Sequence, residues 1–226
     1  QPVDFPPDND QAKLLQEMGM EHERAYLDRL KEQGLSVIEI DGEAGIEVKA
    51  ERTRAALREG PDVIYQGAFL DGPWQGYSDF LLKVPGRSLL GDFHYEVADT
   101  KLARSAKPKH ILQMCVYCDI LAREQGAAPQ KMHVVLGDGN IASVRVEGVI
   151  HYFEFARQRF LEFVGFAPQA SSGAPCGHCT FCRWAQTCDA EWEATNHLSL
   201  VAGLNRGQAE ALRSNGISDL VALSQL

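Results

Sequence analysis

Two aspartates and a lysine lie in segments whose patterns predict neighbouring β-strands. Asp99 and Lys101 are two residues apart in the apolar run YEVADTK, and Asp79 follows the tripeptide GYS in the segment before it. Because successive side chains of a strand point to opposite faces, Asp99 and Lys101 project from the same face. If the two strands pair, both carboxylates meet at one edge of the sheet.

This combination suits hydrolysis of a phosphodiester bond. Two carboxylates offer the hard oxygen ligands that Mg²⁺ or Mn²⁺ prefers. Such a cation polarises the phosphate and lowers the pKa of its bound water. A nearby ammonium orients that water or stabilises the developing negative charge. An Asp-x-Lys pair alone is more often a salt-bridged strand end than a catalytic pair, so the assignment depends on further residues.

Four short motifs occur in an order that resembles the RecB-like form of the PD-(D/E)xK nuclease signature. The motifs, all within the first 120 residues, are Gly19-Met20-Glu21-His22-Glu23, Gly76-Tyr77-Ser78-Asp79, Glu96-Val97-Ala98-Asp99-Thr100-Lys101 and Gln113-Met114-Cys115-Val116-Tyr117. Ser78 stands where the family has proline. The second acidic position is Asp rather than Glu, which the signature allows.

The resemblance implies a metal site beside a catalytic ammonium. It makes His22, Asp79 and Asp99 metal ligands, with the main-chain carbonyl of Thr100 as an additional ligand. Lys101 becomes the catalytic ammonium.

Residues of the following predicted helix would support this site. The resemblance implies that Gln113 and Tyr117, four apart on one helical face, steady the site or touch backbone phosphates. Lys107, Lys109 and His110 precede them and could meet phosphates at the N-terminus of that helix, where the helix dipole favours anions. An ordinary solvated turn explains these three residues equally well.

Three glutamates lie close enough to the motifs to be alternative ligands or structural charges. They are Glu21, Glu23 and Glu96. For Glu21 and Glu23 we expect a solvated helix face.

Four cysteines with the spacing C-x2-C-x2-C-x5-C predict a second metal site. Cys176, Cys179, Cys182 and Cys188 supply four thiolates, which suit a zinc ion or an iron–sulfur cluster. Part of this spacing resembles the C-terminal staple of AddB-type and CRISPR-adaptation nucleases, which implies a 4Fe–4S cluster. In those families the fourth cysteine lies far upstream, so Zn²⁺, with His178 as a further ligand, stays open. The expected role is structural.

The remaining two cysteines, Cys115 and Cys118, match a C-x-x-C pattern but lie in the predicted helix of Gln113. We expect them to be small buried residues. Crowded cysteines without a secretory signal favour metal ligation over disulfides and a reducing, cytoplasmic compartment.

Composition limits the remaining classes. The chain has 226 residues, 45% of them hydrophobic, and a net charge of -9. This charge disfavours non-specific coating of DNA but is neutral for cleavage, because a bound cation inverts the local sign. No apolar run approaches the roughly 20 residues that span a bilayer, so we expect no membrane partner. The first residue is not Met and the last follows a helical pattern, which favours a piece of a longer protein.

Hydrophobic periodicity predicts the elements that would position these residues. We expect helices at 10–34, 48–59, 108–124 and 148–164, and strands at 35–40, 63–69, 76–84, 93–101, 132–136 and 141–146. The order predicts an α/β core with a mixed sheet flanked by helices. The resemblance implies that this core is restriction-endonuclease-like.

The expected organisation has three parts. A nuclease core occupies 1–168, a cysteine-rich metal-cluster segment 169–195, and a small helical hairpin 196–226, after a linker at 168–173. In the last part, Gly-apolar pairs at 203–204 and 216–217 resemble a helix-hairpin-helix module, which offers main-chain N–H groups to a phosphate backbone. A tight turn at Asn215-Gly216 is expected between its two helices.

The sequence thus predicts a Mg²⁺- or Mn²⁺-dependent deoxyribonuclease, an exonuclease acting on DNA ends or single strands in repair, recombination or defence. The resemblance implies a fused or partner helicase or RNase H-like domain. One rival is a non-catalytic, cluster-stabilised DNA-binding scaffold for a helicase, which has no need of Asp79, Asp99 and Lys101 together. Another is a redox protein, which would rest on the cluster alone.

Overall fold

A computed structural model describes residues 10–40, 42–166 and 173–226 of the chain. The predicted linker at 168–173 lies almost entirely outside the described residues. Clustering of contacts divides the chain into two compact units, one of residues 17–165 and one of 1–16 with 166–226. The candidate catalytic residues all belong to the unit of residues 17–165.

The element order of this unit is the predicted one. Its helices are α1 (Asp10–Glu32, from residue 17 on), α2 (Ile46–Glu59), α3 (Pro108–Gln125) and α4 (Ile150–Gly165), with a 3-10 turn, η1 (Val146–Gly148), before the last. Its strands are β1 (Val37–Glu39), β2 (Val63–Asp71), β3 (Trp74–Ser88), β4 (Gly91–Lys101), β5 (Lys131–Leu136) and β6 (Ile141–Arg145). Gly60 and Gly126 end α2 and α3 in the left-handed conformation, with φ of 77° and 66°.

The six strands form one mixed sheet in the order β1-β2-β3-β4-β5-β6. The pairs β1–β2 and β4–β5 are parallel, whereas β2–β3, β3–β4 and β5–β6 are antiparallel. The expectation of an α/β core with a mixed sheet flanked by helices is therefore confirmed.

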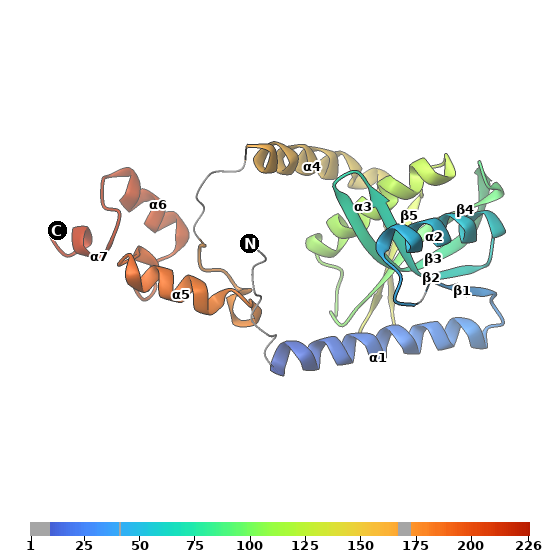
Figure 1. Ribbon diagram of the computed structural model, residues 1–226, viewed down its shortest axis with the longest axis horizontal. Helices are drawn as coiled ribbons and strands as arrows, with labels where there is room; N and C mark the ends of the chain where they lie inside the picture. Colours follow the sequence, from blue (N-terminus) through green and yellow to red (C-terminus); the bar gives the residue numbers. More distant parts are fainter. Residues whose placement is uncertain (1–9, 41, 167–172) are drawn as a thin grey trace. The chain divides into compact units, whose positions relative to one another are not determined.

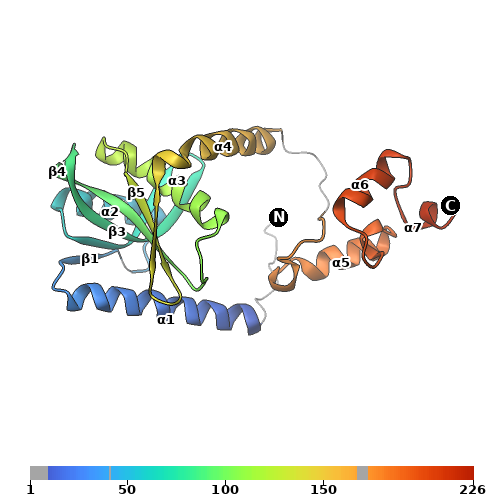
Figure 2. The same ribbon diagram turned by 180° about the vertical axis from the view of Figure 1, so that it is seen from behind.

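Helices cover both faces of the sheet (Figures 1 and 2). On one face α1 packs Tyr26, Leu27 and Leu30 against Phe80 and Ala98 of the central strands. Helices α2, α3 and α4 contribute to the larger core on the other face, where Met114 and Leu121 of α3 are fully buried. Burial of these apolar stripes fixes the rotation of each helix about its axis.

A buried glutamine joins α3 to the sheet. The side chain of Gln125 accepts a hydrogen bond from the amide of Tyr95 (2.8 Å) and donates one to its carbonyl (3.1 Å). The pairing of β4 with β5 begins only at Val97, so Gln125 takes the place of a strand partner before that residue. This contact anchors the end of α3 to the strand that carries Asp99 and Lys101.

The second unit contains α5 (Ala185–Ala194), α6 (Arg206–Ser214) and α7 (Leu220–Leu223), with 3-10 turns η2 (Cys179–Phe181) and η3 (Leu198–Leu200). Two short helices separated by a turn at Asn215 and Gly216 match the predicted hairpin. Helix α5, which carries Cys188, was not predicted. Among the described helices, none combines the length and the apolar character needed to cross a membrane.

Candidate active site

The carboxylates of Asp79 and Asp99 meet where β3 and β4 pair. The register of these strands pairs Phe80 with Ala98, which puts Asp79 across from Asp99. The Asp79 amide nitrogen lies 3.4 Å from Oδ1 of Asp99, and the Lys101 ammonium donates to Oδ2 of Asp99. The predicted convergence of these three residues is thus observed, and Asp99 and Lys101 share a face as strand geometry requires.

Thr100 holds the Asp79 carboxylate in place. Oδ2 of Asp79 accepts hydrogen bonds from both the amide nitrogen and Oγ1 of Thr100, each at 2.7 Å. The Asp79 side chain of β3 is therefore hydrogen-bonded to the backbone of β4 at Thr100. The main-chain carbonyl of Thr100 is one of the predicted metal ligands.

The site carries an excess of negative charge. Asp99 is 1% exposed, and burial together with the charge of Asp79 raises its pKa to about 7, although Lys101 acts in the opposite sense. Burial favours a lower pKa for Lys101, but Asp99, Asp79 and Tyr117 outweigh it and raise the pKa. The negative charge of two carboxylates exceeds the positive charge of one ammonium, so the charge balance of the site favours a further cation.

Gln113 and Tyr117 lie on α3 beside this site. Nε2 of Gln113 donates to the Tyr117 hydroxyl at 3.1 Å, and the Tyr117 ring stacks on Phe69 with centroids 5.7 Å apart. A Cβ atom at Gly76 would lie 2.9 Å from Cε1 of Tyr117, so only glycine allows the ring to lie where it does. The pKa of Tyr117 is raised by burial and by the charges of Asp99 and Asp79.

The start of α3 is basic. Lys107 and Lys109 are exposed, whereas His110 is buried. Burial lowers the pKa of His110, and Lys101, Lys109 and Lys107 lower it further. Lys101 is thus one of the three lysine charges that act on His110 at the start of this helix.

His22 is oriented toward β5. Its Nε2 lies 3.3 Å from the carbonyl oxygen of Val135, which pairs with Thr100 in the parallel ladder of β4 and β5. Within residues 10–40, 42–166 and 173–226, no three His, Cys, Asp or Glu side chains are arranged as a ready set of metal ligands. The structure therefore places His22 near the strand next to the site without joining it to Asp79 and Asp99.

Glu23 lies nearer the carboxylates than the solvated position that the sequence favoured. We expected a solvated position for Glu21 and Glu23, and Glu21 is exposed, but Glu23 is half-buried and hydrogen-bonds Gln66. Burial and the charge of Asp79 raise its pKa. Its position three residues before Tyr26 and four before Leu27 puts it on the core-facing side of α1, a signal the sequence contains.

The backbone of β2 is irregular opposite Asp79. Gln66 has a φ of 55°, and the paired residues on either side of it leave Gln66 across from Asp79. Ile64 and Phe69 are separated by an odd number of positions, so in a regular strand their side chains would point to opposite faces. Both nevertheless pack in the same core cluster, so the alternation of β2 is interrupted between them. A non-glycine residue in this conformation is strained, and such strain concentrates at functional sites.

The Glu96 carboxylate links β4 to the neighbouring strand β5. Its carboxylate accepts hydrogen bonds from the Lys131 amide and from Nε2 of His133, both at 2.9 Å, and His133 also contacts Ser143. These bonds tie β4 to β5 and β6 on the face of the sheet opposite Asp99. The alternative that Glu96 is a ligand of the same site is not supported by this orientation.

The four cysteines of the second candidate site lie close together in sequence and partly in space. The sulfurs of Cys176 and Cys179 are 3.9 Å apart, and the Cys176 amide donates to the Cys179 sulfur at 3.3 Å. Desolvation and then the charges of Cys182, Glu191 and Cys179 raise the pKa of the Cys188 thiol, but within the described part of the chain the four sulfurs are not arranged as a ready ligand set. Cys115 and Cys118 are buried in α3, as predicted.

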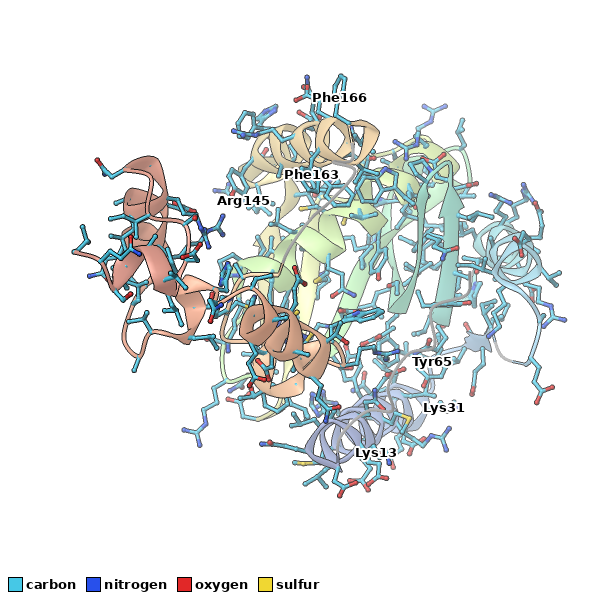
Figure 3. All side chains as sticks on the ribbon, turned by 60° about the vertical axis from the view of Figure 1, so that its left-hand side comes forward. Lys13, Lys31, Tyr65, Arg145, Phe163 and Phe166 are labelled. Atoms are coloured by element: carbon cyan, nitrogen blue, oxygen red, sulfur yellow. The ribbon has the colours of Figure 1, made fainter. Side chains whose placement is uncertain are left out.

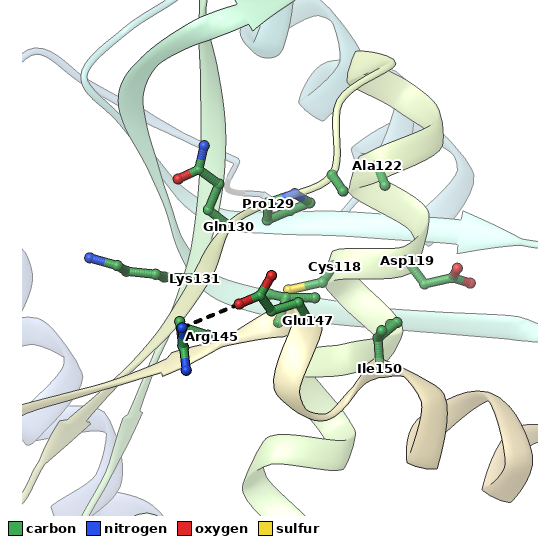
Figure 4. A pocket seen from close by; sticks show the side chains of 11 residues that line it. Cys118, Asp119, Ala122, Pro129, Gln130, Lys131, Arg145, Glu147 and Ile150 are labelled. Carbon is green, nitrogen blue, oxygen red and sulfur yellow. Dashed lines mark ion pairs between the residues drawn. The ribbon is translucent and has the colours of Figure 1, made fainter.

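A cavity of about 520 Å³ lies away from these residues. It is formed by α3, the start of β5 and the end of β6, and Figure 4 shows Arg145 and Glu147, whose side chains are 3.3 Å apart, next to each other on its wall. Parallel pairing puts Lys131 at the start of β5 and Lys101 beside its end, so this cavity and the carboxylate site occupy opposite ends of the sheet.

Comparison with known proteins adds no assignment. A scan against protein-family models and a search of curated proteins both give no match.

Proposed function

We propose that the chain is a metal-dependent nuclease of the RecB-like group of the PD-(D/E)xK superfamily, with a restriction-endonuclease-like core. The observation that carries the proposal is the convergence of Asp79, Asp99 and Lys101 where β3 and β4 pair. A structural ion pair needs one carboxylate and one ammonium, and the second carboxylate, held by Thr100, has no role in such a pair.

The donor set fits Mg²⁺ or Mn²⁺. Two carboxylates and a main-chain carbonyl are oxygen ligands, and a buried Asp99 beside Asp79 is stabilised in its ionised form by a cation. Asp79, Asp99 and the Thr100 carbonyl would hold the ion, and His22 of α1 would complete the set once its imidazole turned from the Val135 carbonyl toward them. The ion supplies polarisation of the phosphate and a water of lowered pKa.

The chain's own residues supply the remaining functions. Lys101 stabilises the negative charge that develops on the phosphoryl oxygens. Gln113 and Tyr117 steady the site from α3, and Lys107 and Lys109 contact phosphates at the start of that helix. The substrate that suits this arrangement is DNA, at ends or in single strands.

The C-terminal unit supports rather than performs the reaction in this proposal. Cys176, Cys179, Cys182 and Cys188 hold a 4Fe–4S cluster or Zn²⁺, which stabilises a segment with little apolar core of its own. The helices after them contact the DNA backbone, and a helicase or RNase H-like domain works with the nuclease.

A cleavage assay tests the proposal. End-labelled single- and double-stranded DNA is incubated with the protein and Mg²⁺, Mn²⁺ or EDTA. We expect metal-dependent cleavage that falls by about 100-fold or more in Lys101→Ala, the scale for loss of one charge-stabilising group. Lys131→Ala, an exposed lysine at the opposite end of the sheet, is the matched control and keeps full activity.

Equal cleavage by Lys101→Ala and the unaltered protein would contradict the catalytic assignment. DNA binding without cleavage in any divalent ion would favour the non-catalytic scaffold instead.

A further inference from the structure

A cavity of about 460 Å³ opens between α1 and β2. Its lining consists of Glu17, Met20, Glu21, Glu23, Arg24, Tyr65 and Gln66. This volume lies within the range of small-ligand sites. Gln66 is across from Asp79 in the sheet, and the charge of Asp79 contributes to raising the pKa of both Glu23 and Tyr65, so the lining lies within electrostatic reach of the carboxylate site.

Tyr65 gives this cavity an aromatic wall of fixed orientation. Its ring packs on Phe80 with centroids 5.3 Å apart, and it lies on the side of the sheet where α1 runs (Figure 3). Nε2 of Gln66 donates a hydrogen bond to the Glu23 carboxylate, the neighbour of this ring in the lining. A half-buried tyrosine held against a neighbouring ring is suited to stack against a flat ligand.

The polar groups of the lining select the kind of ligand. Glu17, Glu21 and Glu23 are opposed by a single guanidinium, Arg24, so the cavity repels a phosphate. A carboxylate only accepts hydrogen bonds, and Glu23 therefore favours a neutral ligand that carries N–H donors. A nucleobase with an amino group has this chemistry as well as a flat face.

We propose that this cavity is a binding subsite for an unpaired, amino-bearing nucleobase next to the phosphate held at Asp79 and Lys101. The inference rests on the proposed nuclease function, whose substrate class it narrows. Tyr65 stacks on the base, Glu23 accepts a hydrogen bond from its amino group, and Gln66 positions Glu23. A base in a duplex cannot enter, because its faces are stacked and its amino group is paired.

Binding measurements test the subsite separately from catalysis. Fluorescence anisotropy is recorded for labelled oligonucleotides of dC, dA or dT and for a duplex, with Ca²⁺ replacing Mg²⁺ so that binding is measured without turnover. We expect tighter binding of dC and dA than of dT. Tyr65→Leu should weaken binding of dC and dA about tenfold, within the range for loss of one stacked base. Tyr65→Phe keeps the ring and should bind within about twofold of the unaltered protein.

A second variant tests the role of the amino group. Glu23→Gln replaces a pure acceptor by a group that also donates, so the preference for dC over dT should shrink. Circular dichroism and thermal unfolding establish that each variant is folded.

The outcomes separate the two proposals. If the protein cleaves DNA but Tyr65→Leu binds as tightly as Tyr65→Phe, the subsite is wrong and the nuclease assignment stands. If binding depends on the Tyr65 ring but no divalent ion supports cleavage, the nuclease assignment is wrong and the subsite stands. Unchanged preference for dC over dT in Glu23→Gln would overturn the proposed recognition of the amino group.

Discussion

The Asp79 carboxylate accepts two hydrogen bonds from Thr100, at 2.7 Å from its amide nitrogen and 2.7 Å from its hydroxyl oxygen. The contact crosses from β3 to β4 and fixes one candidate ligand relative to the backbone that carries the other. Preorganisation of this kind matters because a misplaced group at a reacting centre greatly reduces the rate.

Thr100→Val removes the hydroxyl donor while keeping the shape of the side chain and the amide bond. We expect a loss of about 1–3 kcal/mol in the free energy of unfolding, the range for a bond to a charged group, and slower cleavage. Urea unfolding and initial cleavage rates measure both effects. Thr53→Val is the matched control, because the Thr53 hydroxyl bonds Lys49 and Ala68 away from the site. That control should lose stability without losing cleavage, and equal effects of the two variants on cleavage would contradict a positioning role for Thr100.

The pKa of Asp99 predicts how stability depends on pH in the absence of metal. In the folded protein the pKa is about 7, whereas an unfolded aspartate titrates near pH 4. The folded state therefore binds more protons between these values, and the free energy of unfolding decreases as pH rises from about 4 to 7. The decrease from this group is at most about 4 kcal/mol.

Asp99→Asn removes this titration and should flatten the profile over the same pH window. Urea unfolding in EDTA, compared between variant and unaltered protein at each pH, measures the difference. Parallel profiles would mean that Asp99 is not a buried acid of raised pKa.

Gly76→Ala tests the position of Tyr117. The added Cβ would lie 2.9 Å from the Tyr117 ring, so the ring or the strand must move. We expect destabilisation of about 1–3 kcal/mol, typical of overpacking. In the double variant with Tyr117→Ala the penalty of Gly76→Ala should largely disappear, because the clash no longer exists. Additive effects in a urea-unfolding cycle would contradict the close approach.

The cysteine segment predicts a bound metal in the purified protein. We expect iron with sulfide and a brown colour, or stoichiometric zinc in a colourless preparation, measured by metal analysis and visible absorption. Cys179→Ser should lose the metal and destabilise the C-terminal unit, because thiolate ligation supplies folding free energy. Cys115→Ala, buried in α3, should keep it. Equal metal content in the two variants would contradict ligation by the segment.

Local patterns in the sequence predict most of the core. Alternation and helical periodicity give the order of the elements in the unit of residues 17–165, where Gly60 and Gly126 end α2 and α3. The pairing of Asp99 with Lys101 follows from strand geometry alone. These features depend on neighbours in the chain, which is why sequence patterns contain them.

The features that the sequence did not predict depend on contacts between distant segments. The neighbours His22 and Glu23 both lie near the core-facing side of α1, and packing of Tyr26 and Leu27 on the sheet decides where each side chain points. Gln66 adopts a left-handed backbone conformation that glutamine rarely adopts. Its residue type therefore gives no indication of this conformation in the sequence. Its place opposite Asp79 becomes visible only when β2 and β3 are paired.

Binding of a divalent ion tests the central proposal most directly. Titration of Mn²⁺, followed by calorimetry, is compared between the unaltered protein and the Asp79→Asn/Asp99→Asn double variant, whose side chains keep their size but lose their charge. The cysteine segment is the same in both proteins, so any difference reports on the carboxylates. We predict a Mn²⁺ site that the double variant lacks. Equal Mn²⁺ binding by the two proteins, or none by either, would contradict the proposed site.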